Sequence, residues 1–192
     1  LNKKYPKSVN KLKSMPNRIT LETIKEEITD LTKVPIGYKM NNKEVYYYDF
    51  YNNKNTLIIS KNLSITTYFV ESFTRLISKL TKKLIVLDTL NMVEDISEDN
   101  MTSINRNFDN AIEKLAVDLF KEDELKILLI IGLDSLCKNI KPENFEKLKS
   151  ILYSINNTKY SRAIIIDDIN IIDKRMVEPW TSKVFDANKG IW

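Results

Sequence analysis

The most chemically suggestive stretch of the sequence is SKNLSITT, residues 60–67, because it could form a phosphate-binding loop. The apolar run TLIIS leads into it and an amphipathic segment follows, which is the strand–loop–helix layout of such loops. The consensus G-x-x-x-x-G-K-[ST] ends on a hydroxyl side chain, and Thr67 supplies that hydroxyl in the best alignment. Ser60 and Ile65 then stand in place of the two glycines, and Thr66 stands in place of the lysine.

These replacements remove most of the chemistry of the loop. The glycines let backbone N–H groups curl around a phosphate, and a β-branched residue such as Ile65 rarely adopts a positive φ. The missing lysine deletes a charge-assisted contact worth roughly 1.5–3 kcal/mol. A helix N-terminus still favours an anion, so we expect at most weak binding of ATP and Mg²⁺. The candidate residues are Ser60, Lys61, Asn62, Ser64, Thr66 and Thr67.

Carboxylates at the ends of the other predicted strands form a second candidate set. Asp88, Asp134, Asp167 and Asp168 follow apolar runs, and converging carboxylates can hold Mg²⁺ or polarise a water molecule. A nucleotide hydrolase needs an acidic pair after the run LLII, whereas this chain has Gly132 in an acid position and Asp134 two residues later. Aspartate is also common at helix N-caps. We therefore assign Gly132 and Asp134 to a Walker B-like segment and predict no catalytic residue and no metal site.

The composition excludes several other kinds of site. The 192 residues contain no histidine and one cysteine, Cys137, which rules out a zinc site, a Cys–His nucleophile and a Ser–His–Asp triad. The formal net charge is +4, and the basic excess sits largely in the N-terminal residues. Nucleic-acid binding usually needs a stronger basic field. No apolar run approaches the ~20 residues of a membrane span. We also expect the chain to be a piece of a longer protein.

Short apolar runs alternate with amphipathic segments along the chain. Unbroken apolar strands are typical of a parallel sheet that is covered on both faces, and right-handed crossovers then give a doubly wound, mostly parallel α/β domain. Ligands bind at the carboxyl ends of the strands in such folds, where the candidate residues lie. The predicted strands are residues 56–60, 83–88, 126–132 and 162–167, and the predicted helices include about residues 69–80, 102–121 and 142–155.

We expect a basic leader over residues 1–19 and a single domain over residues 20–192. Within the domain, the pattern predicts a short helix over residues 21–31, a loop at VPIGYKM, a strand over residues 45–50 and a last strand that begins at KGIW. A short helix broken at Pro179 is expected in EPWTSKVFDA. Cys137 and Trp180 are expected to be packing residues.

Several stretches, taken in order, resemble one family: the EssC/EccC coupling ATPases of type VII secretion systems, which belong to the FtsK/SpoIIIE group. VPIGYKMNNKEVYYYDF resembles the leader that opens each of their ATPase modules. TLIIS with ITTYFVESFTRLI is similar to their phosphate-loop segment without the glycines and the lysine, and LLIIGLDSL is similar to their Walker B strand with the acids displaced. AIIIDDIN and EPWTSKVFDANKGIW are similar to the stretch that closes their last module. The resemblance covers about residues 20–192 and implies a P-loop NTPase, RecA-like fold.

The resemblance also implies a function. We expect a degenerate C-terminal module that serves substrate docking, substrate recognition or regulation of export, with little or no ATP hydrolysis of its own. Its partners would be secreted proteins of the small helical WXG type, the preceding ATPase module of the same chain and further copies in an oligomer. One alternative is an ATPase that hydrolyses ATP only within the assembled oligomer, and another is a DNA-translocating motor. The implied location is the cytoplasmic part of a protein anchored in the bacterial cell membrane.

Overall fold

A five-stranded parallel sheet forms the centre of the domain. The structure is a computed structural model that describes residues 28–39, 44–61, 63–121, 123–185 and 191. The strand order is β3-β7-β6-β4-β5, and every neighbouring pair is parallel. The strands are β3 (Asn55–Ser60), β4 (Lys83–Asp88), β5 (Met101–Ile104), β6 (Lys126–Ile131) and β7 (Ser161–Asp168). The doubly wound α/β fold predicted from the apolar runs is confirmed.

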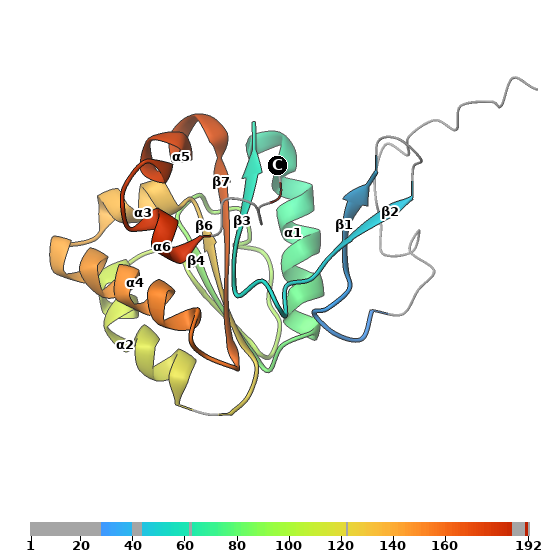
Figure 1. The fold of residues 1–192 in the computed structure, drawn as a ribbon, viewed down its shortest axis with the longest axis horizontal. Helices are drawn as coiled ribbons and strands as arrows, with labels where there is room; N and C mark the ends of the chain where they lie inside the picture. Colours follow the sequence, from blue (N-terminus) through green and yellow to red (C-terminus); the bar gives the residue numbers. More distant parts are fainter. Residues whose placement is uncertain (1–27, 40–43, 62, 122, 186–190, 192) are drawn as a thin grey trace, which may run out of the picture.

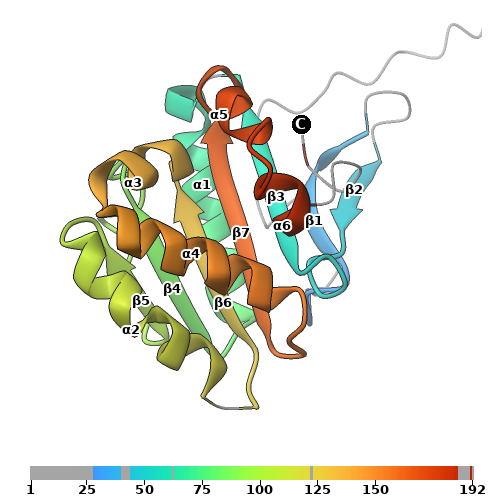
Figure 2. The same ribbon diagram turned by 60° about the vertical axis from the view of Figure 1, so that its left-hand side comes forward.

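Helices cover both faces of this sheet (Figures 1 and 2). Helix α1 (Leu63–Lys79) lies on one face, together with a hairpin of β1 (Val34–Tyr38) and β2 (Val45–Tyr48). The other face carries α2, α3, α4, α5 and α6. These helices are Phe108–Phe120, Leu133–Asn139, Pro142–Ile155, Ile169–Met176 and Thr181–Val184. None of the described helices is both long and apolar enough to cross a membrane.

Alternate residues of each central strand enter two separate cores. In β6, Ile127, Leu129 and Ile131 pack with α1 and the hairpin, whereas Leu128 and Ile130 pack with the helices of the other face. All five side chains are completely buried. Successive side chains of a strand point to opposite faces, so a strand that is covered on both sides is apolar at consecutive positions along its middle, and its buried polar residues lie near its ends. This is why the central strands could be recognised as unbroken apolar runs.

The outer edge of β3 is paired near the end of the chain. The N–H of Ile191 donates to the carbonyl of Leu57 at 2.9 Å, and its carbonyl accepts from the N–H of Ile59 at 2.8 Å. Together these bonds form a parallel bridge between Ile58 and Ile191. Pairing at Ile191 agrees with the last strand expected at KGIW, and the rest of that segment lies outside the described residues.

Some local predictions are wrong. VPIGYKM was expected to be a loop, but residues 34–38 form β1, in which Pro35 and Gly37 flank an irregularity in the pairing. Proline and glycine are tolerated at such edge positions. Residues 28–31 are not helical, and the remainder of the helix predicted over residues 21–31 lies outside the described residues, as does the leader over residues 1–19.

Two further differences lie in the second half of the chain. The helix predicted from residue 102 begins only at Phe108, because residues 101–104 form the partly exposed edge strand β5. The short helices α3 and α5 were not predicted, and each follows directly on a central strand. The helix after Pro142 begins as expected, with this proline in its first turn.

Helix α2 offers a matched pair of positions for testing the core. Leu115 is 2% exposed and Val117 is 62% exposed. We expect Leu115→Ala to lower the free energy of unfolding by about 2–5 kcal/mol, because it loses buried apolar contacts and leaves a cavity. Val117→Ala should change this free energy by less than about 0.5 kcal/mol. Urea unfolding of both variants measures the difference, and equal losses would contradict the orientation of α2.

Candidate functional site

The phosphate-loop candidate lies where β3 meets α1. β3 ends at Ser60 and α1 begins at Leu63, so only residues 61 and 62 connect the strand to the helix. Ser64 and Thr66, which the alignment places in a loop, therefore lie in the first turn of α1, and Thr67 follows them in the helix. The predicted loop is too long. Asn62 lies outside the described residues, and nucleotide binding by Ser60, Lys61, Ser64, Thr66 and Thr67 stays a prediction.

The sheet topology brings the acidic candidates to the same edge as this connection. β7 lies between β3 and β6, and Asp168 is paired with Ser60 at the carboxyl ends of β7 and β3. Asp88 ends β4 on the far side of β6, level with Ile131. The expectation that the candidates gather at the carboxyl edge of the sheet is confirmed.

Three of the four aspartates are engaged by backbone N–H groups. Asp88 is buried and accepts from the N–H groups of Leu90 at 3.1 Å and Val93 at 2.9 Å. Asp168 caps α5 by accepting from the N–H of Asn170 at 2.8 Å. Asp168 therefore has the helix-capping role that is common for aspartate at such positions.

Asp167 is the most deeply placed of these acids. It is 2% exposed, and it accepts from the N–H of Asp134 at 3.1 Å and from the N–H of Asp168 at 2.8 Å. Burial raises the pKa of this carboxyl, against the opposing effect of the backbone hydrogen bonds. Asp167 thus joins the end of β7 to the start of α3.

Asp134, the acid of the Walker B-like segment, is held by two cations. Its Oδ1 accepts from Nε of Arg175 at 2.8 Å, and its Oδ2 pairs with Nζ of Lys138 at 2.5 Å. The aspartate side chain is 10% exposed. Burial alone would raise its pKa, but the hydrogen bonds from Lys138 and Arg175 outweigh burial and hold the pKa below its usual range. Asp134 is therefore an ion-paired carboxylate.

This pair continues into a network that joins α3, α5 and the start of α6. Nη1 of Arg175 donates to Oε1 of Glu178 at 3.0 Å, and Oε2 of Glu178 accepts from Nε1 of Trp180 at 2.7 Å. The indole also meets the ring of Phe145 edge-on, with 5.9 Å between the ring centroids. We refer to Asp134, Lys138, Arg175, Glu178 and Trp180 as the Asp134 network. Trp180 packs as expected, but it is also a hydrogen-bond donor.

Arg175 and Glu178 were not among the predicted site residues. Their only signal was that a buried aspartate needs a cationic partner, and the sequence does not say which cation is near. Cys137 packs against the apolar core, as predicted. Burial raises the pKa of its thiol to about 12, so the thiol stays protonated at neutral pH.

Gly132 has a structural reason to stand where an acid would be expected. Its φ is +81°, in the left-handed region that favours glycine. A Cβ at this position would lie 2.4 Å from Oγ1 of Thr89 and 3.0 Å from Cγ of Leu90. That hydroxyl is itself held, because it donates toward the carbonyls of Ile131 and Gly132 at 2.9 and 3.0 Å. An aspartate or glutamate would therefore meet both backbone strain and a steric clash.

No metal centre is formed by the residues that the structure describes. Among them, no three acidic, cysteine or histidine side chains are grouped so that they could hold a metal ion. At the carboxyl edge the contacts above agree with this, because both oxygens of Asp88, Asp134 and Asp167 and one oxygen of Asp168 already accept from N–H groups or pair with cations. The arrangement favours the anchoring of loops and short helices over the binding of Mg²⁺.

Comparison with known proteins identifies the fold. No protein-family profile and no curated protein matches the chain. Thermomonospora curvata EccC (ATPases 2 and 3), solved in complex with a signal sequence peptide, is similar with a TM-score of 0.64 and 12% identity, over 80% of this chain and 32% of that one. EssC (ATPases 2 and 3) from Geobacillus thermodenitrificans gives 0.61 and 10%, over 92% and 38%. The pCW3 conjugation coupling protein TcpA, solved with ATPγS, gives 0.55 and 15%, over 81% and 52%.

At these identities the likeness shows the fold. The chain has the RecA-like α/β fold of the ATPase domains of EccC and EssC, so the resemblance inferred from the sequence is confirmed at the level of the fold. The chain spans between 20% and 38% of the lengths of those EccC and EssC chains.

The backbone at Gly132 can be tested with a matched pair of glycine variants. We expect Gly132→Ala to lower the free energy of unfolding by about 1–3 kcal/mol, because alanine is strained at this φ and its Cβ meets Thr89. Gly37→Ala is the control, since a Cβ there meets nothing within 4 Å. Thermal and urea unfolding measure both variants. A Gly132→Ala protein as stable as the control would contradict the left-handed conformation.

The ion pairs of Asp134 predict a pH-dependent contribution to stability. Because its folded-state pKa is lowered, this contribution is fully present above the unfolded-state pKa of about 4 and is lost as the pH falls through the folded-state pKa. Asp134→Asn should therefore cost about 1.5–3 kcal/mol at pH 7, and the difference from the wild type should shrink progressively as the pH falls below about 4.

Urea unfolding at pH 7 and at a series of pH values below about 4 measures this effect. Asp118→Asn is the matched control, because Asp118 pairs with Lys83 at a more exposed site, where the two side chains are 46% and 37% exposed. Its cost should stay below about 1 kcal/mol. A cost of Asp134→Asn that did not change with pH would show that the carboxylate charge contributes nothing.

Proposed function

We propose that this chain is an ATPase-fold module of a type VII secretion motor that docks or recognises secreted proteins, or regulates their export, with little or no ATP hydrolysis of its own. The catalytic part of this proposal rests on the short connection between β3 and α1, which is two residues long. A phosphate loop curls several backbone N–H groups around the anion before its helix begins, and two residues leave no length for that curl.

The place of Thr67 in the helix supports the same conclusion. Thr67 is the fifth residue of α1, so it lies about 6 Å along the helix axis from Leu63. An anion bound at the helix N-terminus would contact the N–H groups of the first turn. A hydroxyl that must hold Mg²⁺ beside that anion should lie at the same end of the helix, and Thr67 lies beyond the first turn.

The Walker B-like segment supports the proposal independently. Both carboxylate oxygens of Asp134 are bound to cations, so Mg²⁺ or an attacking water would have to displace Arg175 or Lys138. Gly132 leaves no space for a second acid at its position. The geometry thus favours a structural use of this segment over catalysis.

The docking part of the proposal comes from the fold. The EccC protein that shares this fold was solved in complex with a signal sequence peptide, and we extend peptide docking to this chain. The proposal places residues 20–192 as one degenerate module behind a leader over residues 1–19. That module would follow another ATPase module of a longer chain, which is anchored in the cell membrane and acts on its cytoplasmic side, with further copies in an oligomer.

The catalytic part is tested by ATP turnover. We expect the purified chain with Mg²⁺ and ATP to release phosphate no faster than buffer does, and Thr67→Ala to behave in the same way. Calorimetry at millimolar ATP should show weak binding or none. Turnover that is lost in Thr67→Ala would refute the proposal, and strong ATP binding without turnover would favour hydrolysis in the assembled oligomer.

The docking part is tested separately with peptides. A fluorescent peptide that carries the C-terminal signal of a small helical secreted protein should bind saturably, whereas the same peptide with its residues scrambled should not. Equal binding of both peptides, or of neither, would remove the docking role whatever the outcome of the ATP experiment.

A further inference from the structure

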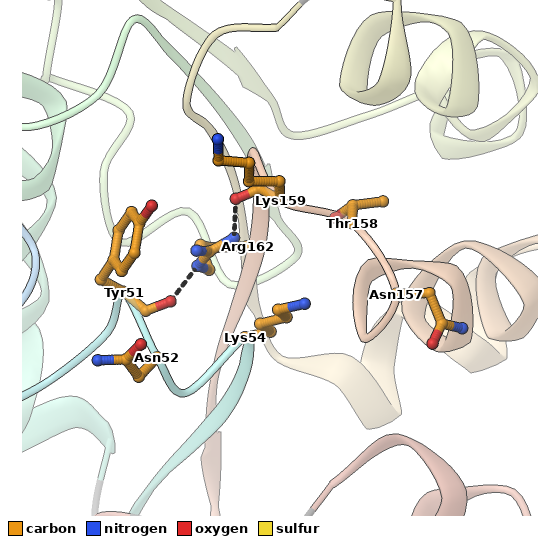
Figure 3. A pocket seen from close by; sticks show the side chains of 7 residues that line it. All are labelled: Tyr51, Asn52, Lys54, Asn157, Thr158, Lys159 and Arg162. Atoms are coloured by element: carbon orange, nitrogen blue, oxygen red, sulfur yellow. Dashed lines mark hydrogen bonds between the residues drawn. The ribbon is translucent and has the colours of Figure 1, made fainter.

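A hollow of about 260 Å³ lies at the amino ends of β3 and β7 (Figure 3). These ends form the edge of the sheet opposite to the phosphate-loop candidate. Two turns form it: one leads into β3, and the other joins α4 to β7. We call it the cationic pocket, because three of its lining residues are basic and none is acidic. The basic residues are Lys54, Lys159 and Arg162, and its polar neighbours include Asn52, Asn157 and Thr158.

Arg162 is the most buried member of the pocket and holds its two turns together. It is 2% exposed, and its Nε donates to the carbonyl of Tyr51 at 2.7 Å (Figure 3). Its Nη1 donates to the carbonyls of Lys159 at 3.0 Å and Ser161 at 2.7 Å. These acceptors are uncharged, and within the described part of the chain no carboxylate forms an ion pair with this guanidinium. The charge is therefore held in place without being neutralised.

Lys54 and Lys159 add two further charges. Nζ of Lys54 donates to the carbonyl of Asn156 at 3.0 Å, where it offsets the negative C-terminal end of α4. Nζ of Lys159 lies 5.1 Å from the centroid of the Tyr160 ring and interacts with the hydroxyl of that side chain. Neither lysine forms an ion pair with any carboxylate that the structure describes.

The two acids nearest to the pocket are Asp49, which is hydrogen-bonded to Asn52, and Asp123, which has only a minor effect on Lys159. Asp49 acts on Arg162 through space, but its carboxylate accepts from the backbone N–H of Asn52 at 2.8 Å and from Nδ2 of the same residue at 2.6 Å. Asp123 contributes only a minor through-space effect on Lys159. Neither acid lines the hollow, so no carboxylate among the described residues neutralises the positive charge of the pocket from within it.

We propose that the cationic pocket binds a phosphate group. A phosphate monoester carries about −1.5 to −2 charge at pH 7 and offers three acceptor oxygens, which suits the two lysines and the neighbouring amide and hydroxyl groups, while the buried Arg162 adds positive charge through space. A carboxylate offers one charge and two oxygens and would leave more of the positive charge unbalanced. The site is separate from the phosphate-loop candidate, so it does not depend on the proposed function.

The test is an NMR titration of the isotope-labelled chain with inorganic phosphate, in which chloride maintains a constant ionic strength. We expect saturable shifts of the amides of residues 51–54 and 157–162, and about tenfold weaker binding of acetate. Saturable shifts confined to residues 60–67 would overturn the assignment, as would equal affinities for phosphate and acetate or a titration without saturation.

Variants locate the binding without disturbing the fold. Lys54→Gln and Lys159→Gln should each weaken phosphate binding about three- to tenfold. Lys147→Gln is the control, because Lys147 is exposed on α4 and does not line the pocket, and it should leave the affinity unchanged. Arg162 is left intact in these experiments because it joins the two turns. Phosphate affinity that is the same in all three variants would refute the pocket.

Discussion

Burial of the parallel sheet on both faces is the constraint on which the rest of this structure depends. Parallel strands need crossover connections, and here helices supply most of them while covering the sheet. Every strand then ends at the same edge, which brings the β3–α1 connection, Gly132 and the strand-end aspartates together. The turns that lead into β3 and β7 meet at the other edge, where the cationic pocket lies. The two candidate regions are therefore separated by the length of the strands.

The same constraint explains how much of the fold the sequence reveals. β3, β4, β6 and β7 could be predicted because each contains an unbroken run of buried apolar residues, such as ILLII in β6. β5 and β1 could not, since β5 is half-exposed at the edge of the sheet and β1 carries Pro35 and Gly37, which are more typical of a loop. The seven-residue helix α3 is too short to show a convincing helical period. The elements that could not be predicted are therefore the ones that are too exposed, too irregular or too short to show a clear pattern.

The chemistry of the candidate site was less predictable than its location. The positions of the aspartates followed from the strand ends, but the partner of Asp134 is Arg175, which is 41 residues away in the sequence. Only the path of α5 brings the two together. The reason for Gly132 was also hidden, because neither its positive φ nor the approach of Thr89 can be read from local sequence. Sequence patterns indicate which groups reach an edge, whereas long-range packing decides how they are used.

If the proposed function is right, these contacts also explain why restoring one nucleotide-binding motif would not by itself restore ATP hydrolysis. Glycines and a lysine restored in residues 60–67 would still meet a Walker B-like segment whose aspartate is paired with Arg175 and Lys138. An acid restored at Gly132 would require Thr89 and Leu90 to move. Both obstacles are stabilising contacts of the fold, since the Asp134 network ties α5 and the start of α6 to α3. In that proposal, residues that would correspond to an active site serve the packing that holds the short helices in place.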